Sequence, residues 1–468
     1  MSSDAMIRAA IEHARANRES YLEGFKELLR IPSISTDPAY RADVERAARW
    51  VAAEMERIGL HNCQVLPSAG HPVVFGEWLQ AGDDRPTVLI YAHYDVQPVD
   101  PLDLWESPPF EPQIRDGKLF ARGVIDDKCG VWITLKVLES ILRTAGRLPV
   151  NIKLFFEGEE EMGSPSMAAF VEQHKHLLAA DLLVVSDGGS EPDRPLNMSA
   201  LRGIVAAEVI VTGPSHDLHS GQFGGIVHNP AHLVGKIIGA LHDDAGHVQI
   251  PGFYDDVVPL SPLEREQLDA QQAEVEPLMR EQAGVDTFWG PSEWTLLERA
   301  TAQPTCDVNG IFGGYDGPGT KTIIPARAGF KATMRLVANQ DPHTIARQFE
   351  SFVRGFATDT LKLEVKVLGE GWPVQLLVEG PAIDALNRAY ESVWGKPAKF
   401  YRQGGSVPIT GFFRAALNTP MTSLGYGTGY NEHAPNEYLI LEYFDRGIDT
   451  AIHFLYYLAD MADGKRVA

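Results

Sequence analysis

Two short stretches of the chain place histidine and aspartate side chains where they could bind a metal ion. His93 and Asp95 form a His-x-Asp pair, and residues two apart on a strand face the same side, so the carboxylate could orient the imidazole. Asp126 and Asp127 are adjacent and precede a predicted helix, where a single aspartate would suffice as a cap. Each pair by itself also fits a structural role, as a hydrogen-bonded core histidine or a helix cap.

Three further stretches supply a glutamate run, an aspartate in a turn and a loop histidine. Glu159, Glu160 and Glu161 follow an apolar strand, Asp187 lies in VVSDGG, and His433 lies in GYNEHAPNEY. Each alone is typical of a solvated face, an Asp-Gly turn or a surface histidine. Together, two imidazoles and several carboxylates suit two divalent ions that share a bridging carboxylate, with zinc first and manganese second. Such a pair would activate a water and polarise a carbonyl oxygen, with a spare carboxylate as general base.

These side chains follow predicted strands at their carboxyl ends. Strands are expected over Thr87–Asp95, Val150–Gly158 and Asp181–Gly189, with a helix over Lys128–Ala145 between the first two. Each strand runs into His, Asp or Glu, and ligands of open α/β sheets bind at that edge. The sequence therefore predicts an α/β catalytic domain with a mixed sheet flanked by helices.

A second unit, of α+β type, is predicted as an insertion in the first. We place the catalytic domain at residues 1–201 and 372–468, and an inserted lid and dimerisation domain at 202–371. Its expected elements are a strand in Leu201–Pro214, a helix near Asn229–His242, a long, less regular stretch to about Thr305, a strand over Arg327–Val337, a helix over His343–Ala357 and a strand over Leu361–Leu368. A helix around Ala382–Trp394 returns the chain to the catalytic domain.

Composition narrows the partners and the compartment. Among 468 residues, 41 Lys and Arg against 63 Asp and Glu give a net charge of −22, which repels nucleic acid and anionic lipid. Cys63, Cys129 and Cys306 are too few and too scattered for a disulfide framework. The first residues read as an amphipathic helix without a signal-peptide core or a membrane span. We predict a cytoplasmic enzyme with no nucleic acid or membrane partner.

The strings YAHYDVQPVDPLDLWESPPFEP, RGVIDDK, FEGEEEMGSPS, VVSDGG, DLHSGQFGG and NEHAPNEY resemble the dinuclear-zinc metallopeptidase family of cytosolic non-specific dipeptidase, carnosinase and carboxypeptidase G. The resemblance implies that His93 and Asp187 bind one metal ion and that Glu161 and His433 bind the other. It implies that Asp126 bridges the two ions and is followed by a cis peptide bond.

The same resemblance implies roles for further residues. Asp95 would orient His93 and Glu160 would be the general base, whereas Glu159 receives no role. His219 would act in the neighbouring subunit of a homodimer, and substrate oxygens or the C-terminal carboxylate would be bound by Thr322, Arg335 and Ser406. Cys129 departs from the family pattern, which has glycine there; we interpret it as a small buried side chain.

The function expected from these residues is hydrolysis of the peptide bond in dipeptides or similar small peptides. The long insertion favours a dipeptidase. A deacylase of N-acyl amino acids, or a carboxypeptidase acting on capped amino acids, would use the same metal ions and stays open. A non-catalytic binding protein that retains the fold is the third hypothesis, and the presence of every ligand position and of the base argues against it.

Overall fold

The chain passes from one unit into a second and back again. The computed structural model describes residues 2–188, 190–191, 194–403, 407–462, 464 and 466–468. The first unit comprises Met1–Ser199, Leu376–Tyr401 and Pro408–Ala468, and the second comprises Ala200–Gln375 and Arg402–Val407. The chain leaves the first unit along β8 (Leu196–Leu201) and returns to it after β15 (Val374–Gln375). Along β16 (Lys399–Gln403) it passes from the first unit into the second once more. The lid and dimerisation roles expected of the inserted domain stay predictions.

A six-stranded mixed sheet organises the first unit. Its strand order is β1-β2-β6-β3-β7-β17, with β3 parallel to both β6 and β7, β17 parallel to β7, and β1 and β2 added antiparallel at one edge. The strands are β1 (His61–Leu66), β2 (Val73–Trp78), β3 (Thr87–His93), β6 (Asn151–Glu157), β7 (Leu182–Val185) and β17 (Met421–Ser423). The three strands expected from the sequence are all present; β3 and β6 are slightly shorter than predicted, whereas β7 has only four residues and ends at Val185.

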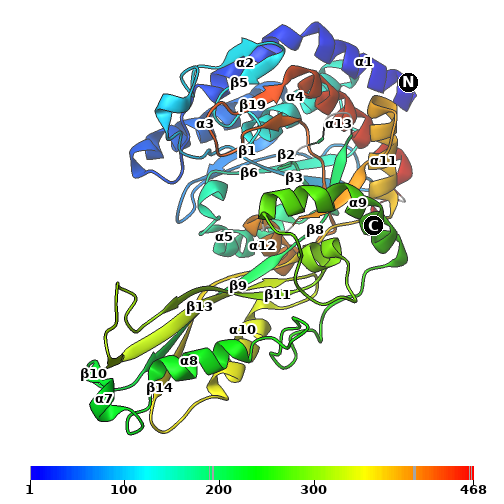
Figure 1. Cartoon of the computed structure of the whole chain (residues 1–468). Coiled ribbons are helices and arrows are strands. Elements are labelled where there is room, and N and C mark those ends of the chain that lie inside the picture. The colour runs from blue at the N-terminus through cyan, green and yellow to red at the C-terminus, as the bar shows by residue number, and fades with distance from the viewer. Residues whose placement is uncertain (1, 189, 192–193, 404–406, 463, 465) are drawn as a thin grey trace. The chain divides into compact units, whose positions relative to one another are not determined.

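Helices cover both faces of this sheet (Figure 1). Along β3, Val88, Ile90 and Ala92 join the core formed with the long helices, while Tyr91 points the other way and packs against Phe413. This alternation is the period of two that a strand buried on both faces must satisfy. One layer contains α1 (Ser3–Ala16), α3 (Arg41–Ile58), α4 (Lys128–Ala145), α11 (Pro381–Trp394) and α13 (Leu441–Met461); the other contains α5 (Met167–Gln173) and α12 (Pro408–Leu417). The predicted fold class is confirmed.

The predicted N-terminal amphipathic helix is present as α1, followed by α2 (Arg18–Leu29). Ile7, Ala10 and Ala14 recur at intervals of three and four and are buried in the core of the first unit. Within the part of the chain that the structure describes, no helix combines the length and apolar character needed to cross a bilayer.

A small antiparallel sheet lies in the first unit beside the loop that carries His433. Its strand order is β18-β19-β5-β4, formed by Gly429–Tyr430, Tyr438–Ile440, Lys118–Phe120 and Gln113–Arg115. Tyr438 pairs with both Tyr430 and Phe120. The turn from β18 to β19 is therefore fixed at both ends, and it contains the NEHAPNEY segment. The remaining short helix of this unit is α6 (Lys175–Leu178).

The second unit is built on a four-stranded antiparallel sheet. The strand order is β11-β13-β9-β14, formed by Thr305–Phe312, Arg327–Leu336, Gly203–Thr212 and Lys362–Gly371. Helices α8 (Pro230–Gly239) and α10 (Pro342–Arg354) pack on one face of this sheet over a core that includes Val205, Val209 and Phe330. Residues of the opposite face, such as Lys331 and Arg335, are exposed or half-buried. Shorter elements are α7 (Ser220–Phe223), β10 (Leu218–His219) and β12 (Ile323–Ile324).

One expectation for this unit was wrong. The stretch before Thr305 was predicted to be less regular, yet it contains the 22-residue helix α9 (Pro262–Ala283). Among its described side chains few are buried, Leu268 being one, so the sequence carries no apolar stripe at helical spacing. A local signal was available: the Ser261 hydroxyl accepts the N–H of Glu264, whose carboxylate accepts the N–H of Ser261.

Candidate metal centre

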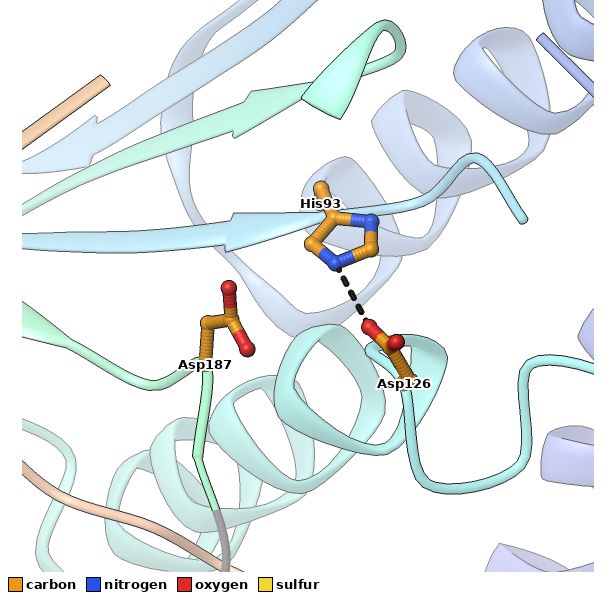
Figure 2. A group of neighbouring side chains, drawn as sticks. All are labelled: His93, Asp126 and Asp187. Atoms are coloured by element: carbon orange, nitrogen blue, oxygen red, sulfur yellow. Dashed lines mark hydrogen bonds and ion pairs between the residues drawn. The ribbon is translucent and has the colours of Figure 1, made fainter. Parts of the chain in front are cut away.

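The carboxyl edge of the large sheet brings His93, Asp126 and Asp187 together (Figure 2). His93 is the last residue of β3, Asp187 follows β7, and Asp126 precedes α4. One ligand atom from each of the three lies within 4.8 Å of the others. His93 Nε2 is 3.0 Å from Asp126 Oδ1. Three elements distant in sequence thus converge on one point with two carboxylates and an imidazole.

A second group shares Asp126 with the first. His433 Nε2 lies 2.9 Å from Asp126 Oδ2 and 3.3 Å from Glu161 Oε2. Asp126 therefore turns one oxygen toward His93 and the other toward His433. A carboxylate that faces two neighbouring groups of donors has the arrangement that a bridging ligand requires, and a donor set of imidazoles and carboxylates suits zinc or manganese.

The pKa shifts at this edge of the sheet indicate an excess of negative charge. Burial raises the pKa of Glu160 to about 9, and burial together with the nearby Asp126 raises the pKa of Asp187 to about 6. The pKa of His433 rises to about 10, chiefly because Asp126 and Glu161 accept its hydrogen bonds. Buried carboxylates that lie close together are stabilised when they bind positive charge, either as protons or as metal ions.

The Asp95 carboxylate contacts both His93 and the turn that contains Glu160 and Glu161. His93 Nδ1 lies 3.3 Å from Asp95 Oδ1, which leaves Nε2 as the nitrogen facing Asp126. The Asp95 carboxylate also accepts the backbone N–H groups of Glu160 and Glu161, at 3.3 and 3.1 Å. One buried carboxylate thus orients the imidazole and fixes the turn that presents the two glutamates.

Sequence reasoning missed Gln97, whose Nε2 donates to Glu161 Oε2 at 2.7 Å. The signal was modest: Gln97 continues the alternation of His93 and Asp95 by two more positions. Because an amide donor can occupy only part of a carboxylate, Gln97 orients Glu161 and leaves oxygen lone pairs for His433 or a cation.

Glu159, to which the resemblance assigned no role, is buried and holds two neighbouring loops together. Its carboxylate accepts the N–H of His71 at 3.0 Å and both the N–H and the hydroxyl of Ser166 at 2.7 Å. A Cβ atom at Gly70 would lie 1.9 Å from Glu159 Oε2, so the loop passes this carboxylate too closely for any side chain. The three adjacent glutamates therefore have separate surroundings.

Glu437 shapes the turn before Asp126 and was also missed. Its buried carboxylate accepts the N–H groups of Gly123, Ile125 and Asp126 at 2.8, 2.9 and 3.3 Å, and Arg122 Nη1 donates to it at 2.8 Å. The sequence signal was its place in NEHAPNEY, four residues after His433. The NEHAPNEY segment thus supplies the candidate ligand His433 and also Glu437, which holds the turn before the candidate ligand Asp126.

The surroundings of Asp126 match two further expectations. The peptide bond between Asp126 and Asp127 is cis, as the resemblance implied. Asp127 Oδ2 accepts the backbone N–H of His93 at 3.3 Å, so this second aspartate braces the strand end. Cys129 is buried, and its thiol donates to the Ile125 carbonyl at 3.1 Å, in keeping with its interpretation as a small buried side chain.

Of the remaining predicted site residues, three lie in the second unit. His219 ends β10, paired with Ile323, and the Ser220 N–H donates to the Thr322 carbonyl at 3.0 Å, so His219 and Thr322 are neighbours. Arg335 lies on β13, where it pairs with Ile204 and Thr305. Ser406 lies outside the described residues.

Comparison with known proteins identifies the class. Residues 89–457 match the model of peptidase family M20/M25/M40. The Cys-Gly metallodipeptidase dug1 of Schizosaccharomyces pombe is 31% identical, over 95% of this chain and 97% of the relative. The Beta-Ala-His dipeptidase of Homo sapiens is 28% identical, over 92% of this chain and 89% of the relative.

Solved structures agree with this class. The M20 family metallo-carboxypeptidase Sso-CP2 from Sulfolobus solfataricus superposes with a TM-score of 0.78 at 31% identity, over 94% of this chain and 99% of that structure. This chain belongs to peptidase family M20/M25/M40. It is a metallopeptidase, and the predicted class of enzyme is confirmed.

Proposed function

We propose that this peptidase cleaves dipeptides by means of two metal ions bound at the sheet edge. The observation that carries the proposal is the pair of three-residue groups that share Asp126. His93 and Asp187 would hold one ion, Glu161 and His433 the other, with Asp126 between them; zinc is the first choice and manganese the second. When bound, the ions supply the Lewis acidity that activates a water and polarises the scissile carbonyl.

Glu160 is the residue to which we assign the proton transfer. It would take a proton from the attacking water and deliver it to the leaving amine. Burial raises the pKa of its carboxyl to about 9 in the protein without cations, and bound cations would lower that pKa. Its backbone N–H is held by Asp95, so the carboxylate starts from a fixed turn.

His219 is proposed to stabilise the oxyanion in the site of a partner subunit, within a homodimer. Its Nδ1 accepts the Gly221 N–H at 3.0 Å, so in the neutral ring Nε2 carries the proton and is a donor. The side chain is exposed within its own unit, as a group that serves another subunit must be. Thr322, Arg335 and Ser406 would hold substrate oxygens, Arg335 taking the C-terminal carboxylate.

The substrate is proposed from the relatives and the donor set together. Two curated relatives carry dipeptidase names, and one similar structure is a carboxypeptidase, so carboxypeptidase or N-acyl-amino-acid deacylase activity is the alternative. The cytoplasm is the proposed compartment, supported by the free thiols of Cys63, Cys129 and Cys306.

The experiment is a panel of dipeptides and N-acetylated amino acids, assayed with metal-stripped enzyme to which zinc or manganese is restored. A dipeptidase cleaves the unblocked peptides with the higher kcat/KM and loses activity on stripping. Higher kcat/KM for the N-acetylated series would favour the deacylase, and metal-independent turnover would refute the proposal.

The role of His219 in the partner subunit has its own test. A Glu160→Ala subunit is mixed with a His219→Ala subunit, each inactive as a homodimer. If His219 acts across the dimer, each mixed dimer has one complete site, and random exchange restores about a quarter of wild-type activity. If it acts within its own subunit, every site lacks one group, and no activity returns although exchange is confirmed by mass.

A further inference from the structure

Two arginines meet at one end of the half-exposed face of the sheet in the second unit. Arg335 lies on β13 and pairs with Ile204 on one side and with Thr305 on the other. Arg202 immediately precedes β9, and its Nη2 donates to the Thr305 hydroxyl at 2.9 Å. Because β13 lies between β9 and β11, the Arg202 side chain must cross the end of β13 where Arg335 is anchored.

Neither guanidinium is fully satisfied. Arg202 is only 8% exposed; Nη1 donates to the Ala300 carbonyl at 2.6 Å, but the buried Nε has no hydrogen-bond partner among the described residues. The Arg335 guanidinium makes no hydrogen bond or ion pair with any residue in the described ranges. An orphaned buried donor costs free energy unless a ligand or water accepts from it.

Arg202, Arg335 and the neighbouring Asp307 together carry one net positive charge. The pKa of Arg202 is lowered to about 10, chiefly by burial and also by the positive charge of Arg335, whereas Asp307 acts in the opposite direction. Asp307 is the acid that offsets this pair, and its carboxylate also accepts the Thr305 hydroxyl at 3.1 Å. Two guanidinium groups and one carboxylate leave one positive charge, which a singly charged anion would neutralise.

We propose that Arg202 and Arg335 together bind one carboxylate, that of the C-terminal residue of the peptide substrate, with the Arg202 Nε–H as a donor. This inference rests on the proposed function, in which the carboxylate is assigned to Arg335 alone. A planar guanidinium matches a carboxylate in geometry, and a single charge matches the imbalance better than a doubly charged phosphate. Arg202 thereby selects substrates with a free carboxyl terminus.

The test compares Ala-Ala with its C-terminal amide in the metal-loaded enzyme. Arg202→Met should lower kcat/KM for Ala-Ala roughly 10- to 100-fold, mainly through KM, because a hydrogen bond to a charged group is lost. Arg202→Met should leave kcat/KM for the amide unaffected. Lys331→Met is the matched control, because it removes a cation from the same face of β13, and it should leave kcat/KM for both substrates unaffected. Arg202→Met and Arg335→Ala combined should lose less than the sum of the two, since they share one anion.

Equal losses for the peptide and the amide would show that Arg202 only supports the loop at Ala300, and would overturn the inference. Arg202→Lys covers the case in which the methionine variant does not fold: it keeps the charge but lacks the planar donor, and should still lower the preference for Ala-Ala over the amide.

Direct binding separates this inference from the proposed function. Ala-Ala is titrated calorimetrically into metal-loaded Glu160→Gln enzyme, with and without the Arg202 substitution. If the wild type cleaved no dipeptide, the proposed function would fail, yet binding weakened about 10-fold by the substitution would still support the carboxylate site. Unchanged affinity would overturn it whatever the turnover.

Discussion

The two groups of candidate ligands differ in how the fold supports them. His93 has 1% of its side chain exposed and ends a central strand, whereas 56% of the His433 side chain is exposed. His433 has a φ of 58° and lies in a loop held by side chains, with Asn436 Nδ2 donating to the Leu104 carbonyl at 2.8 Å. A site fixed by a sheet and a site fixed by a loop should hold their ions unequally. We expect the ion beside His433 to exchange first.

The largest effect is expected at Glu160, which is adjacent to the proposed ligand Glu161 but should not bind metal itself. Glu160→Gln should lower kcat by about 100- to 10,000-fold while the enzyme retains both ions, because only the proton acceptor is lost. Activity assays and elemental analysis on the same sample check this. A variant that lost one ion would mean that Glu160 and Glu161 have exchanged roles; Glu161→Gln, the matched control, should lose the ion beside His433.

Replacing each histidine by alanine tests the comparison directly. His433→Ala should lose one of the two ions and melt close to the metal-free wild type. His93→Ala should lose metal and also melt lower, since it removes one of the partners of the buried Asp95 carboxylate, at a cost of about 1–3 kcal/mol. Elemental analysis gives the metal content of each variant. Thermal unfolding in the presence of a chelator compares the melting temperatures of the metal-free proteins. Equal destabilisation would contradict the distinction between sheet and loop.

Metal uptake at the second group should depend on pH. In the protein without cations the pKa of His433 is raised to about 10 by hydrogen bonds to Asp126 and Glu161, so the ring is protonated at neutral pH. A protonated imidazole cannot ligate, and binding must release that proton. Affinity should therefore rise by about tenfold per pH unit between pH 6 and 9 from this proton. Chelator competition at three pH values measures the slope, and His433→Ala should reduce it by one; an unchanged slope would contradict the assignment.

A smaller effect is expected at Glu437, which touches the backbone before Asp126. Glu437→Gln keeps the size but replaces one accepting oxygen with an amide, so the turn of Gly123–Asp126 should loosen. Metal affinity should fall by about tenfold, in the range typical of groups that orient ligands. Glu432→Gln, an exposed glutamate of the same loop, is the control and should change nothing. Equal affinities of the two variants would remove Glu437 from the set of positioning residues.

Local pattern was sufficient for the elements that position the centre. Helix α4 has the predicted bounds, Lys128–Ala145, because its apolar residues repeat at helical spacing before a glycine. The strand ends marked His93 and Asp187 as neighbours without any tertiary information, since parallel strands finish at one edge.

Pattern could not separate the roles within the Glu159–Glu161 run. The three glutamates are held by partners outside the run: Ser166 donates to the Glu159 carboxylate, Gln97 donates to that of Glu161, and Asp95 accepts the backbone N–H of Glu160. Helix α9 was not predicted for a different reason. Its capping box is a local signal, but few of its described side chains are buried, so its apolar residues show no helical spacing.

The interruption of the first unit by the second has a consequence during synthesis of the chain. Strand β17, which pairs with β7 through Met421 and Leu183, and helix α13, which is buried in the same core, both follow the inserted residues 200–375. A ribosome needs roughly 10–35 s to translate that insertion. For that interval the nascent N-terminal half presents an unpaired β7 edge and an apolar core that lacks α11 and α13, the kind of surface that chaperones bind. The enzyme therefore reaches its working form only after its last helix has emerged.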